Sequence, residues 1–240
     1  MAGTYTFRVN GREVSTNEDK KLIRFLRDDL HLTSVKDGCS EGACGSCTVI
    51  ADHKAVRACI KQTSEMAGKE ILTCEGLTGR EEEAFVYAFG KVGAVQCGFC
   101  TPGMVMSAKC CIDQNPSPTE EEIKAAIRGN LCRCTGYQKL VEGIHLAARI
   151  LRGEEQVDRT LEEGADSGIG TSAFRRDVRA KVTGRGIYPD DIYMEGMLHA
   201  SCVRSLYPRA RVKKIDCAQA KKLPGVVAIL TAGDVPNNKV

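Results

Sequence analysis

The chain has 240 residues, of which 27% are charged and 5% aromatic, and its formal net charge is +3 at pH 7. Charges of both signs are well mixed, so neither a nucleic-acid partner nor a polybasic membrane anchor is expected. No apolar run approaches the roughly 18 residues of a transmembrane helix, so no membrane insertion is expected. The start lacks the apolar core of a signal peptide, and the 13 cysteines are an odd number, which together favour a cytoplasmic protein without a disulfide framework.

Residues 1–78 are predicted to form a small α+β unit. The first strand alternates apolar and polar residues, and Asn10-Gly11 is typical of a hairpin turn. Apolar residues then recur at helical spacing from Asp19 to Leu30. The expected elements are strands at 4–9, from Glu13 onward, and at 47–51, 56–60 and 71–74, and a helix at 19–30.

Four cysteines of this unit have the spacing Cys39-x4-Cys44-x2-Cys47, closed by Cys59 after eleven residues. This is the plant-type ferredoxin spacing for a [2Fe–2S] cluster. One tight loop must supply three thiolates, because a strand or helix cannot direct three neighbouring side chains to one centre. The glycines in the loop permit positive φ and let backbone N–H groups face the cluster sulfurs. Structural zinc is the alternative, which the glycine-rich triple disfavours.

Residues 79–152 are predicted to form a helical bundle. Thr119-x-x-Glu122 is a capping box that follows a proline-rich break. Apolar residues then repeat about every four positions from Leu140 to Leu151. The expected helices cover residues 82–95, 104–112, 119–127 and a last segment through Leu140, Ile144, Ala147 and Leu151.

A second group of cysteines lies at the ends of these helices. Its spacing is Cys97-x2-Cys100, closed by Cys132-x-Cys134 after 31 residues. Helix N-termini can direct free N–H groups toward a thiolate-ligated cluster, but four cysteines in two pairs also suit zinc. Both alternatives are open from the spacing alone. The remaining cysteines are expected to be small buried apolar residues: Cys74, Cys110, Cys111, Cys202 and Cys217.

Residues 153–172 are rich in acidic residues, glycine and serine and are predicted to be an exposed linker. The third part, residues 173–240, is predicted to contain β-α-β-like material that forms only part of a domain. Its strands are expected at 197–204, 211–216 and 226–231, with a helix at 218–222.

The stretches 38–49, 96–104 and 130–137 resemble the iron–sulfur part of the molybdenum hydroxylases, the xanthine dehydrogenase / aldehyde oxidoreductase family. The resemblance covers residues 1–152. It implies an α+β chain with an N-terminal β-grasp, ferredoxin-like domain that holds one [2Fe–2S] cluster. A four-helix domain follows, with a second cluster near a molybdopterin. The resemblance therefore favours [2Fe–2S] over zinc at Cys97, Cys100, Cys132 and Cys134.

The third part resembles the same family at 182–188, 196–200, 203–205 and 222–226, which look like the opening of an α/β hammerhead domain of the molybdenum-binding subunit. No flavin domain lies between the two parts, which resembles the flavin-free aldehyde oxidoreductases and related purine hydroxylases. The chain ends at Val240, before the residues that would bind molybdenum or act as catalytic base. The expectation is either a separate catalytic polypeptide or a truncated product.

The resemblance also implies roles and partners. Gln96 and Cys134 are expected at the pterin edge, where electrons enter. The cluster at Cys97 would accept electrons first, and the cluster at Cys39 would pass them to an FAD-binding subunit or another acceptor. The expected main partner is a large molybdenum-binding subunit that holds most of the molybdopterin.

Alternatives remain at this point. The chain is either this relay, a free-standing ferredoxin-type carrier, a zinc-stabilised interaction module or a non-functional truncation. The third part disfavours a free-standing carrier, and the ferredoxin triple disfavours zinc. Purine, aldehyde and N-heterocycle substrates are all open, and a purine such as xanthine is favoured because that branch is common in split-subunit form.

Overall fold

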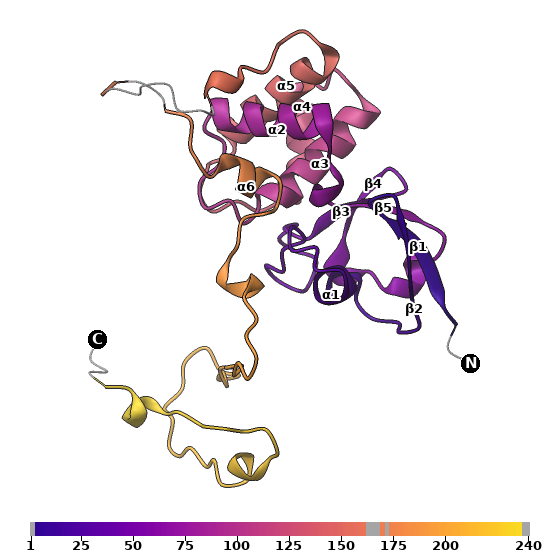
Figure 1. Ribbon diagram of the computed structural model, residues 1–240. Helices are drawn as coiled ribbons and strands as arrows, with labels where there is room; N and C mark the ends of the chain where they lie inside the picture. Colours follow the sequence, from indigo (N-terminus) through magenta and orange to yellow (C-terminus); the bar gives the residue numbers. More distant parts are fainter. Residues whose placement is uncertain (1–2, 162–168, 171–172, 237–240) are drawn as a thin grey trace. The chain divides into compact units, whose positions relative to one another are not determined.

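The computed structural model describes residues 3–161, 169–170 and 173–236 (Figure 1). The chain divides into two compact units, Met1–Ile192 and Tyr193–Val240. The first unit contains a five-stranded sheet and a bundle of helices, which Figure 1 shows as two neighbouring bodies. Within the described residues, no helix combines the length and the apolarity that crossing a bilayer requires.

The N-terminal part is a β-grasp sheet with the strand order β2-β1-β5-β3-β4, in which β1 and β5 are parallel and the other neighbours antiparallel. Asn10 and Gly11 form the predicted turn between the first two strands. Phe7 and Val9 are buried on one face, as the alternation predicts. The strands are β1 (Tyr5–Val9), β2 (Arg12–Thr16), β3 (Thr48–Ala51), β4 (Lys54–Arg57) and β5 (Glu70–Leu72).

The helical segment that packs on this sheet is shorter than the predicted 19–30. It consists of α1 (Leu22–Arg24) and a π-helical turn at Phe25–Asp29. The first three residues of the prediction pair elsewhere: Ser64 N–H donates to Asp19 Oδ1 (3.0 Å), Thr63 N–H donates to Lys20 O (2.9 Å), and Lys21 bridges to Gln62. These contacts with a distant turn hold the backbone extended and delay the start of the helix.

The predicted strands at 56–60 and 71–74 are displaced toward the N-terminus. β4 ends at Arg57, where the ladder with β3 ends opposite Thr48, and Ala58–Ile60 then forms a 3-10 turn. Cys59 therefore lies on this turn and not on a strand. Likewise β5 ends at Leu72, and a 3-10 turn covers Cys74–Gly76. A strand needs a paired neighbour, which the alternation of the sequence does not reveal.

Four helices form the second body of the first unit, and α3 lies against β3 of the sheet. The capping box at Thr119 is confirmed: Glu122 N–H donates to Thr119 Oγ1 (3.2 Å) and Thr119 N–H to Glu122 Oε2 (2.7 Å). Phe85 and Phe89 are fully buried in the bundle core. The helices are α2 (Gly79–Lys91), α3 (Thr101–Gln114), α4 (Glu120–Ile127) and α5 (Gln138–Arg152).

The first of these helices ends before the predicted Val95. Gly93 has φ +71°, and Ala94 N–H donates to Phe89 O (2.9 Å). This is a Schellman ending, in which the left-handed residue closes the last turn and satisfies carbonyls that lack helical partners. The chain is thereby released to form the loop that carries Cys97.

The residues after α5 pack against the helical bundle over part of their length. In the predicted linker 153–172, Glu155 pairs with Lys91 (3.1 Å), and the half-buried Val157 contacts the bundle core. The remaining linker positions 162–168 and 171–172 lie outside the described residues. The next helix, α6 (Val178–Val182), buries Val178 and Val182 in the same core.

Residues 173–192, which the sequence analysis grouped with the third part, thus belong to the first compact unit. Apolar side chains of α6 and ion pairs to α2 attach this segment to the bundle: Arg179 Nη1 lies 3.2 Å from Glu82 Oε1 and 3.0 Å from Glu83 Oε1. Composition indicated only that a new segment begins here, not which body it packs on.

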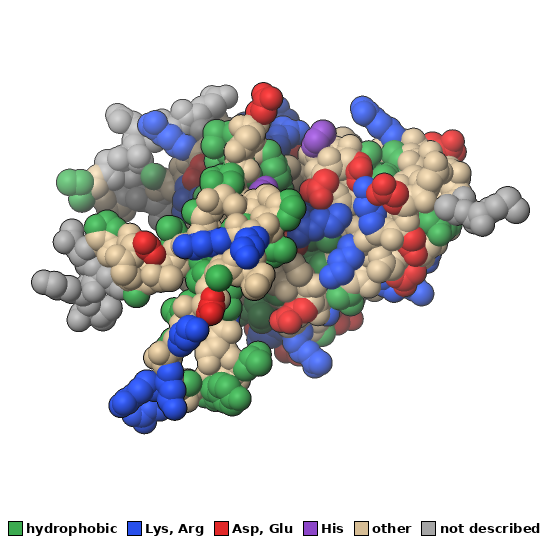
Figure 2. Space-filling view, turned by 90° about the horizontal axis from the view of Figure 1, so that it is seen from below, with side chains coloured by type: hydrophobic (Ala, Val, Ile, Leu, Met, Phe, Trp, Pro, Cys, Tyr) green, Lys and Arg blue, Asp and Glu red, His purple; other side chains and the backbone are tan. Residues whose placement is uncertain are grey.

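In the second unit the prediction of three strands is wrong for the described residues 193–236, whose secondary structure consists of 3-10 turns at Ala220–Lys222 and Ala232–Asp234. The alternating apolar side chains of this unit are present but exposed. On the face of the molecule drawn in Figure 2, hydrophobic and basic side chains lie beside one another. An alternating segment forms a strand only when another strand satisfies its N–H and C=O groups. The exposed apolar residues of this unit include Leu198, Val203, Leu206, Val212 and Ile215.

Candidate iron–sulfur sites

The loop before β3 and the 3-10 turn after β4 bring the first cysteine group together. Cys47 and Cys59 are buried, while Cys39 and Cys44 are half-buried. Backbone N–H groups face their sulfurs: Gly42 N–H donates to Cys59 Sγ (3.2 Å) and Cys44 N–H to Cys39 Sγ (3.4 Å). Such donors stabilise negative charge on sulfur.

The pKa values of this group follow from the loop. Burial raises the pKa of the Cys39 thiol, but backbone N–H groups of the loop outweigh burial and bring it to about 7. Burial raises the pKa of Cys47 to about 12, and the thiols of Cys59 and Cys44 add to the effect. The loop therefore favours the thiolate form of the more exposed Cys39. At the buried Cys47, a bound metal centre would have to supply the positive charge that stabilises a thiolate.

The second group lies at the ends of four helices. Cys97 is in the loop after α2 and Cys100 is the N-cap of α3, whereas Cys132 and Cys134 lie between α4 and α5. Thr135 Oγ1 donates to Cys132 Sγ (3.1 Å). Although burial acts to raise the pKa of Cys132, hydrogen bonds from Thr135 and nearby N–H groups lower it overall. Burial raises the pKa of Cys100.

At both sites the thiols lie close enough to interact. In the first site Cys39 interacts with Cys44, and Cys47 with both Cys59 and Cys44. In the second site Cys100 interacts with Cys132 and Cys97, and Cys134 with Cys97 and Cys132. Four thiolates are the ligand set of a [2Fe–2S] cluster and also one of the ligand sets of structural zinc. The donor set at each site therefore fits a [2Fe–2S] cluster.

A hydrogen bond connects the two sites directly. Leu131 N–H donates to Cys44 O (2.8 Å), and Leu131 precedes Cys132 in the chain. Beside it the buried Asn130 donates from Nδ2 to Gly45 O (2.9 Å) and accepts from Ser107 Oγ (2.8 Å). One hydrogen bond and the adjoining peptide thus separate a cysteine of the first site from a cysteine of the second.

The two residues expected at the pterin edge are on the surface. Gln96 and Cys134 are both exposed, as is Cys97, whose thiol interacts with that of Cys134. They form the outer side of the second site, while Cys100 and Cys132 form its inner, half-buried side. This exposed side leaves room for another molecule to contact the site.

Several contributors were not predicted from the sequence. Asn130 and Tyr137 stand within the motifs, but spacing gave them no role; Tyr137 Oη accepts from Cys132 N–H (2.8 Å) and donates to Asn130 O (3.2 Å). The other five cysteines belong to neither group. Cys74 and Cys110 are buried as expected, Cys111 and Cys217 are half-buried, and Cys202 is exposed.

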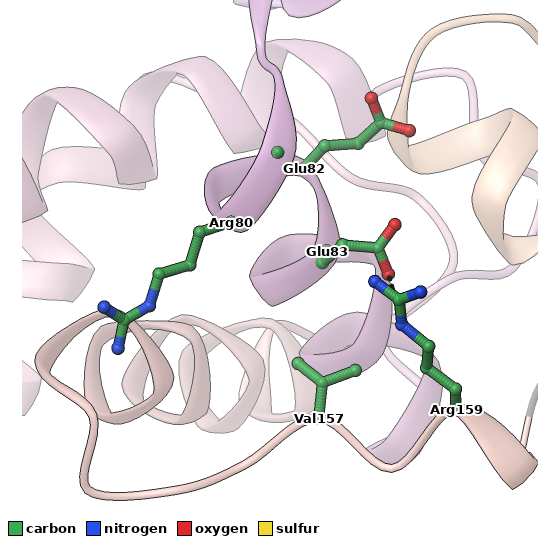
Figure 3. Close-up of a pocket in the computed structure, with 6 residues that line it drawn as sticks. Arg80, Glu82, Glu83, Val157 and Arg159 are labelled. Atoms are coloured by element: carbon green, nitrogen blue, oxygen red, sulfur yellow. Dashed lines mark ion pairs between the residues drawn. The ribbon is translucent and has the colours of Figure 1, made fainter.

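A surface pocket at the start of α2 is separate from both sites (Figure 3). Figure 3 shows Glu83 directed toward Arg159, with 4.0 Å between the charged groups. No thiol lines the pocket, and its acids pair with Arg179 of α6, so it serves to anchor that helix. The lining residues are Gly79, Arg80, Glu82, Glu83, Val157 and Arg159.

Comparisons with known families agree with these sites. Residues 7–77 match the family of 2Fe–2S iron–sulfur cluster binding domains, and residues 73–145 match the [2Fe–2S] binding domain family. Residues 183–240 match the a/b hammerhead domain of aldehyde oxidase and xanthine dehydrogenase. The chain therefore contains two [2Fe–2S]-binding domains and a hammerhead segment in this order.

Individual relatives cover either the whole chain or its first two parts. The aldehyde oxidoreductase of Megalodesulfovibrio gigas is 38% identical over 238 residues, 95% of this chain and 26% of that protein. The nicotinate dehydrogenase small FeS subunit of Eubacterium barkeri is 46% identical over 149 residues, 61% of this chain and 92% of that subunit.

The crystal structure of the aldehyde oxidoreductase from Desulfovibrio desulfuricans ATCC 27774 superposes with a TM-score of 0.84 at 41% identity, over 97% of this chain and 27% of that one. The chain thus spans about a quarter of the two aldehyde oxidoreductases, but nearly all of the nicotinate dehydrogenase subunit. It belongs to the [2Fe–2S] part of the molybdenum hydroxylases, the aldehyde oxidoreductase / xanthine dehydrogenase family.

Proposed function

We propose that this chain is the electron-transfer part of a molybdopterin-dependent hydroxylase. In this proposal Cys39, Cys44, Cys47 and Cys59 hold one [2Fe–2S] cluster, and Cys97, Cys100, Cys132 and Cys134 hold the other. The closeness of the thiols within each group supports this assignment. A bound [2Fe–2S] cluster supplies one-electron redox chemistry, at a potential set by net charge, solvent exposure and hydrogen bonds to its sulfurs.

The hydrogen bond from Leu131 N–H to Cys44 O carries the proposal, because it joins the two sites through the protein backbone. Asn130 holds the two loops together at this point through Gly45. The chain receives electrons at the exposed side of the second site and releases them at the first. Gln96 and Cys134 face the molybdopterin of a large partner subunit, and an FAD-binding subunit or another acceptor takes the electrons from the loop around Cys39.

We propose an aldehyde as the substrate class. The support is the order of the three parts, which an aldehyde oxidoreductase shares over 97% of this chain at 41% identity. A purine, which the sequence analysis favoured, and an N-heterocycle remain the alternative predictions of the substrate class. Anaerobic mixing of the oxidised, purified complex with acetaldehyde, xanthine or nicotinate distinguishes them, because only the true substrate class reduces the clusters and so bleaches their visible absorbance.

The proposal is tested by metal analysis and EPR of the complex purified through this chain, before and after dithionite reduction. We expect about four irons per chain, two distinct reduced [2Fe–2S] signals and copurifying molybdenum. Cys39→Ser and Cys97→Ser should each abolish one signal, while the control Cys111→Ser, at a half-buried cysteine outside both groups, keeps both signals. Iron without molybdenum would indicate a free-standing carrier, and zinc in place of iron would refute the relay.

A further inference from the structure

Three successive carbonyls at the start of the second cysteine loop are each capped by a side chain from much later in the chain. All three donors come from the segment around α6. The hydrogen bonds are Arg175 Nη1 to Val95 O (3.5 Å), Lys181 Nζ to Gln96 O (3.0 Å) and Tyr188 Oη to Cys97 O (2.8 Å). The loop that leads into Cys97 is therefore held from one side by a single later segment.

Tyr188 is the donor nearest the cysteines, and its ring is fixed on two sides. The ring meets Phe99 edge-on, with centroids 5.3 Å apart and an interplanar angle of 88°. Lys36 Nζ lies 4.7 Å from the ring centroid. An edge-on aromatic pair and a cation over the ring face each favour one ring orientation. The hydroxyl is thus aimed at the Cys97 carbonyl by the packing of its own ring.

Asp191 fastens the end of this segment to the β-grasp part. Its Oδ1 lies 2.9 Å from Arg27 Nη2 and its Oδ2 2.5 Å from Lys36 Nζ. The side chains of Arg27, Lys36 and Asp191 are only 2%, 0% and 4% exposed. Tyr188 N–H also donates to Asp191 Oδ2 (3.0 Å), so the same carboxylate holds the backbone of Tyr188.

The loop backbone accommodates this segment at Gly98. A Cβ at this position would lie 2.6 Å from Lys181 Cδ and 2.7 Å from Tyr188 Oη, and the residue has φ +84°. Only glycine allows so close an approach in this conformation. The donors lie outside residues 73–145, which match the second cluster-binding family, and Tyr188 lies within the hammerhead match.

We propose that residues 175–191 form a clamp on the loop carrying Cys97 and Cys100, and that Tyr188 is a positioning residue for the cluster held there. This rests on the proposed function of the two cysteine groups. The Tyr188 hydroxyl fixes the peptide between Cys97 and Gly98 and withdraws electron density from its carbonyl. Loss of a donor close to a cluster ligand disfavours the reduced, more negative state, so the potential of that cluster falls.

Tyr188→Phe keeps the ring and its packing and removes only the hydroxyl. We expect EPR-monitored redox titration of the full chain to give a lower midpoint and an altered line shape for the signal that Cys97→Ser abolishes. The signal that Cys39→Ser abolishes keeps its midpoint. Lys181→Met, which frees the Gln96 carbonyl, should shift the same signal in the same direction. Tyr193→Phe, at an exposed tyrosine with no bond to the loop, is the matched control.

An unchanged midpoint for the Cys97 signal in both variants would overturn the clamp, as would an equal shift in Tyr193→Phe or in the Cys39 signal. Failure of the wild-type chain to show two reduced signals would instead refute the proposed function. The two failures are therefore distinguishable in one set of titrations.

Discussion

Asp191→Asn tests how strongly the segment around Tyr188 is attached to the β-grasp part. The carboxylate is nearly fully buried and accepts from Arg27 and Lys36, which are themselves buried. The Asn side chain has the same shape but no charge. Its oxygen can accept from one of the two cations, while its NH2 group faces the other and cannot accept a hydrogen bond. The substitution therefore leaves two buried positive charges next to a neutral group.

Breaking a buried pair by removing the charge of one partner costs about 3–5 kcal/mol. The cost is expected in the docking of residues 183–192 and not in the whole fold, because the cores of the sheet and bundle do not include Asp191. A loss of about 3 kcal/mol raises the population of the detached segment roughly a hundredfold. Amide exchange of the Gly186 and Asp191 N–H groups, which donate to Ala180 O and Tyr188 O, should accelerate by that factor.

The assay is hydrogen exchange followed by mass spectrometry on the cluster-loaded chain. Asp190→Asn is the matched control: its carboxylate is 57% exposed and lies 3.5 Å from Arg27 Nη2, so the expected cost is at most about 1 kcal/mol. Equal exchange of residues 183–192 in wild type and Asp191→Asn would refute the reasoning, and so would equal acceleration in both variants.

The Asp191 carboxylate also determines the pH below which the docking of this segment weakens. Burial acts to raise the pKa of Asp191, but the hydrogen bonds from Lys36 and Arg27 outweigh it and hold the pKa below its usual 3.8. The folded pKa is depressed, so the contribution to docking is present above the unfolded pKa and is lost as pH falls through the folded one. Wild-type protection of this segment should therefore not weaken through Asp191 until the pH falls below 3.8.

Two further substitutions test the connection of the sites and one helix start. Asn130→Ala removes buried hydrogen bonds to Gly45 and Ser107, and should lower the free energy of unfolding by about 2–3 kcal/mol. Anaerobic urea unfolding measures this loss, and the exposed control Asn17→Ala should keep the wild-type midpoint. A wild-type midpoint for Asn130→Ala would contradict the role of Asn130 in joining the two loops. Thr119→Ala removes the N-cap of α4 at a cost of about 1 kcal/mol, seen as faster exchange of the Glu122 amide; an unchanged rate would argue against the cap.

The sequence by itself determined the features that neighbouring residues encode. The two cysteine spacings identified both groups, and the structure brings the thiols of each group close together. The turn at Asn10 and the cap at Thr119 were predicted because turn and cap chemistry acts over two to four residues. Helical periodicity found the bundle, because the apolar face of each helix is written in consecutive turns.

The tertiary structure decided what depends on partners far apart in the chain. Cys59 lies on a 3-10 turn because the ladder with β3 ends at Arg57, and alternation cannot reveal where a ladder ends. Asn130 joins loops 85 positions apart, and Tyr188 reaches a carbonyl 91 positions away. The expected strands beyond residue 192 are absent from the described residues, because backbone pairing comes from a neighbour and not from the segment itself.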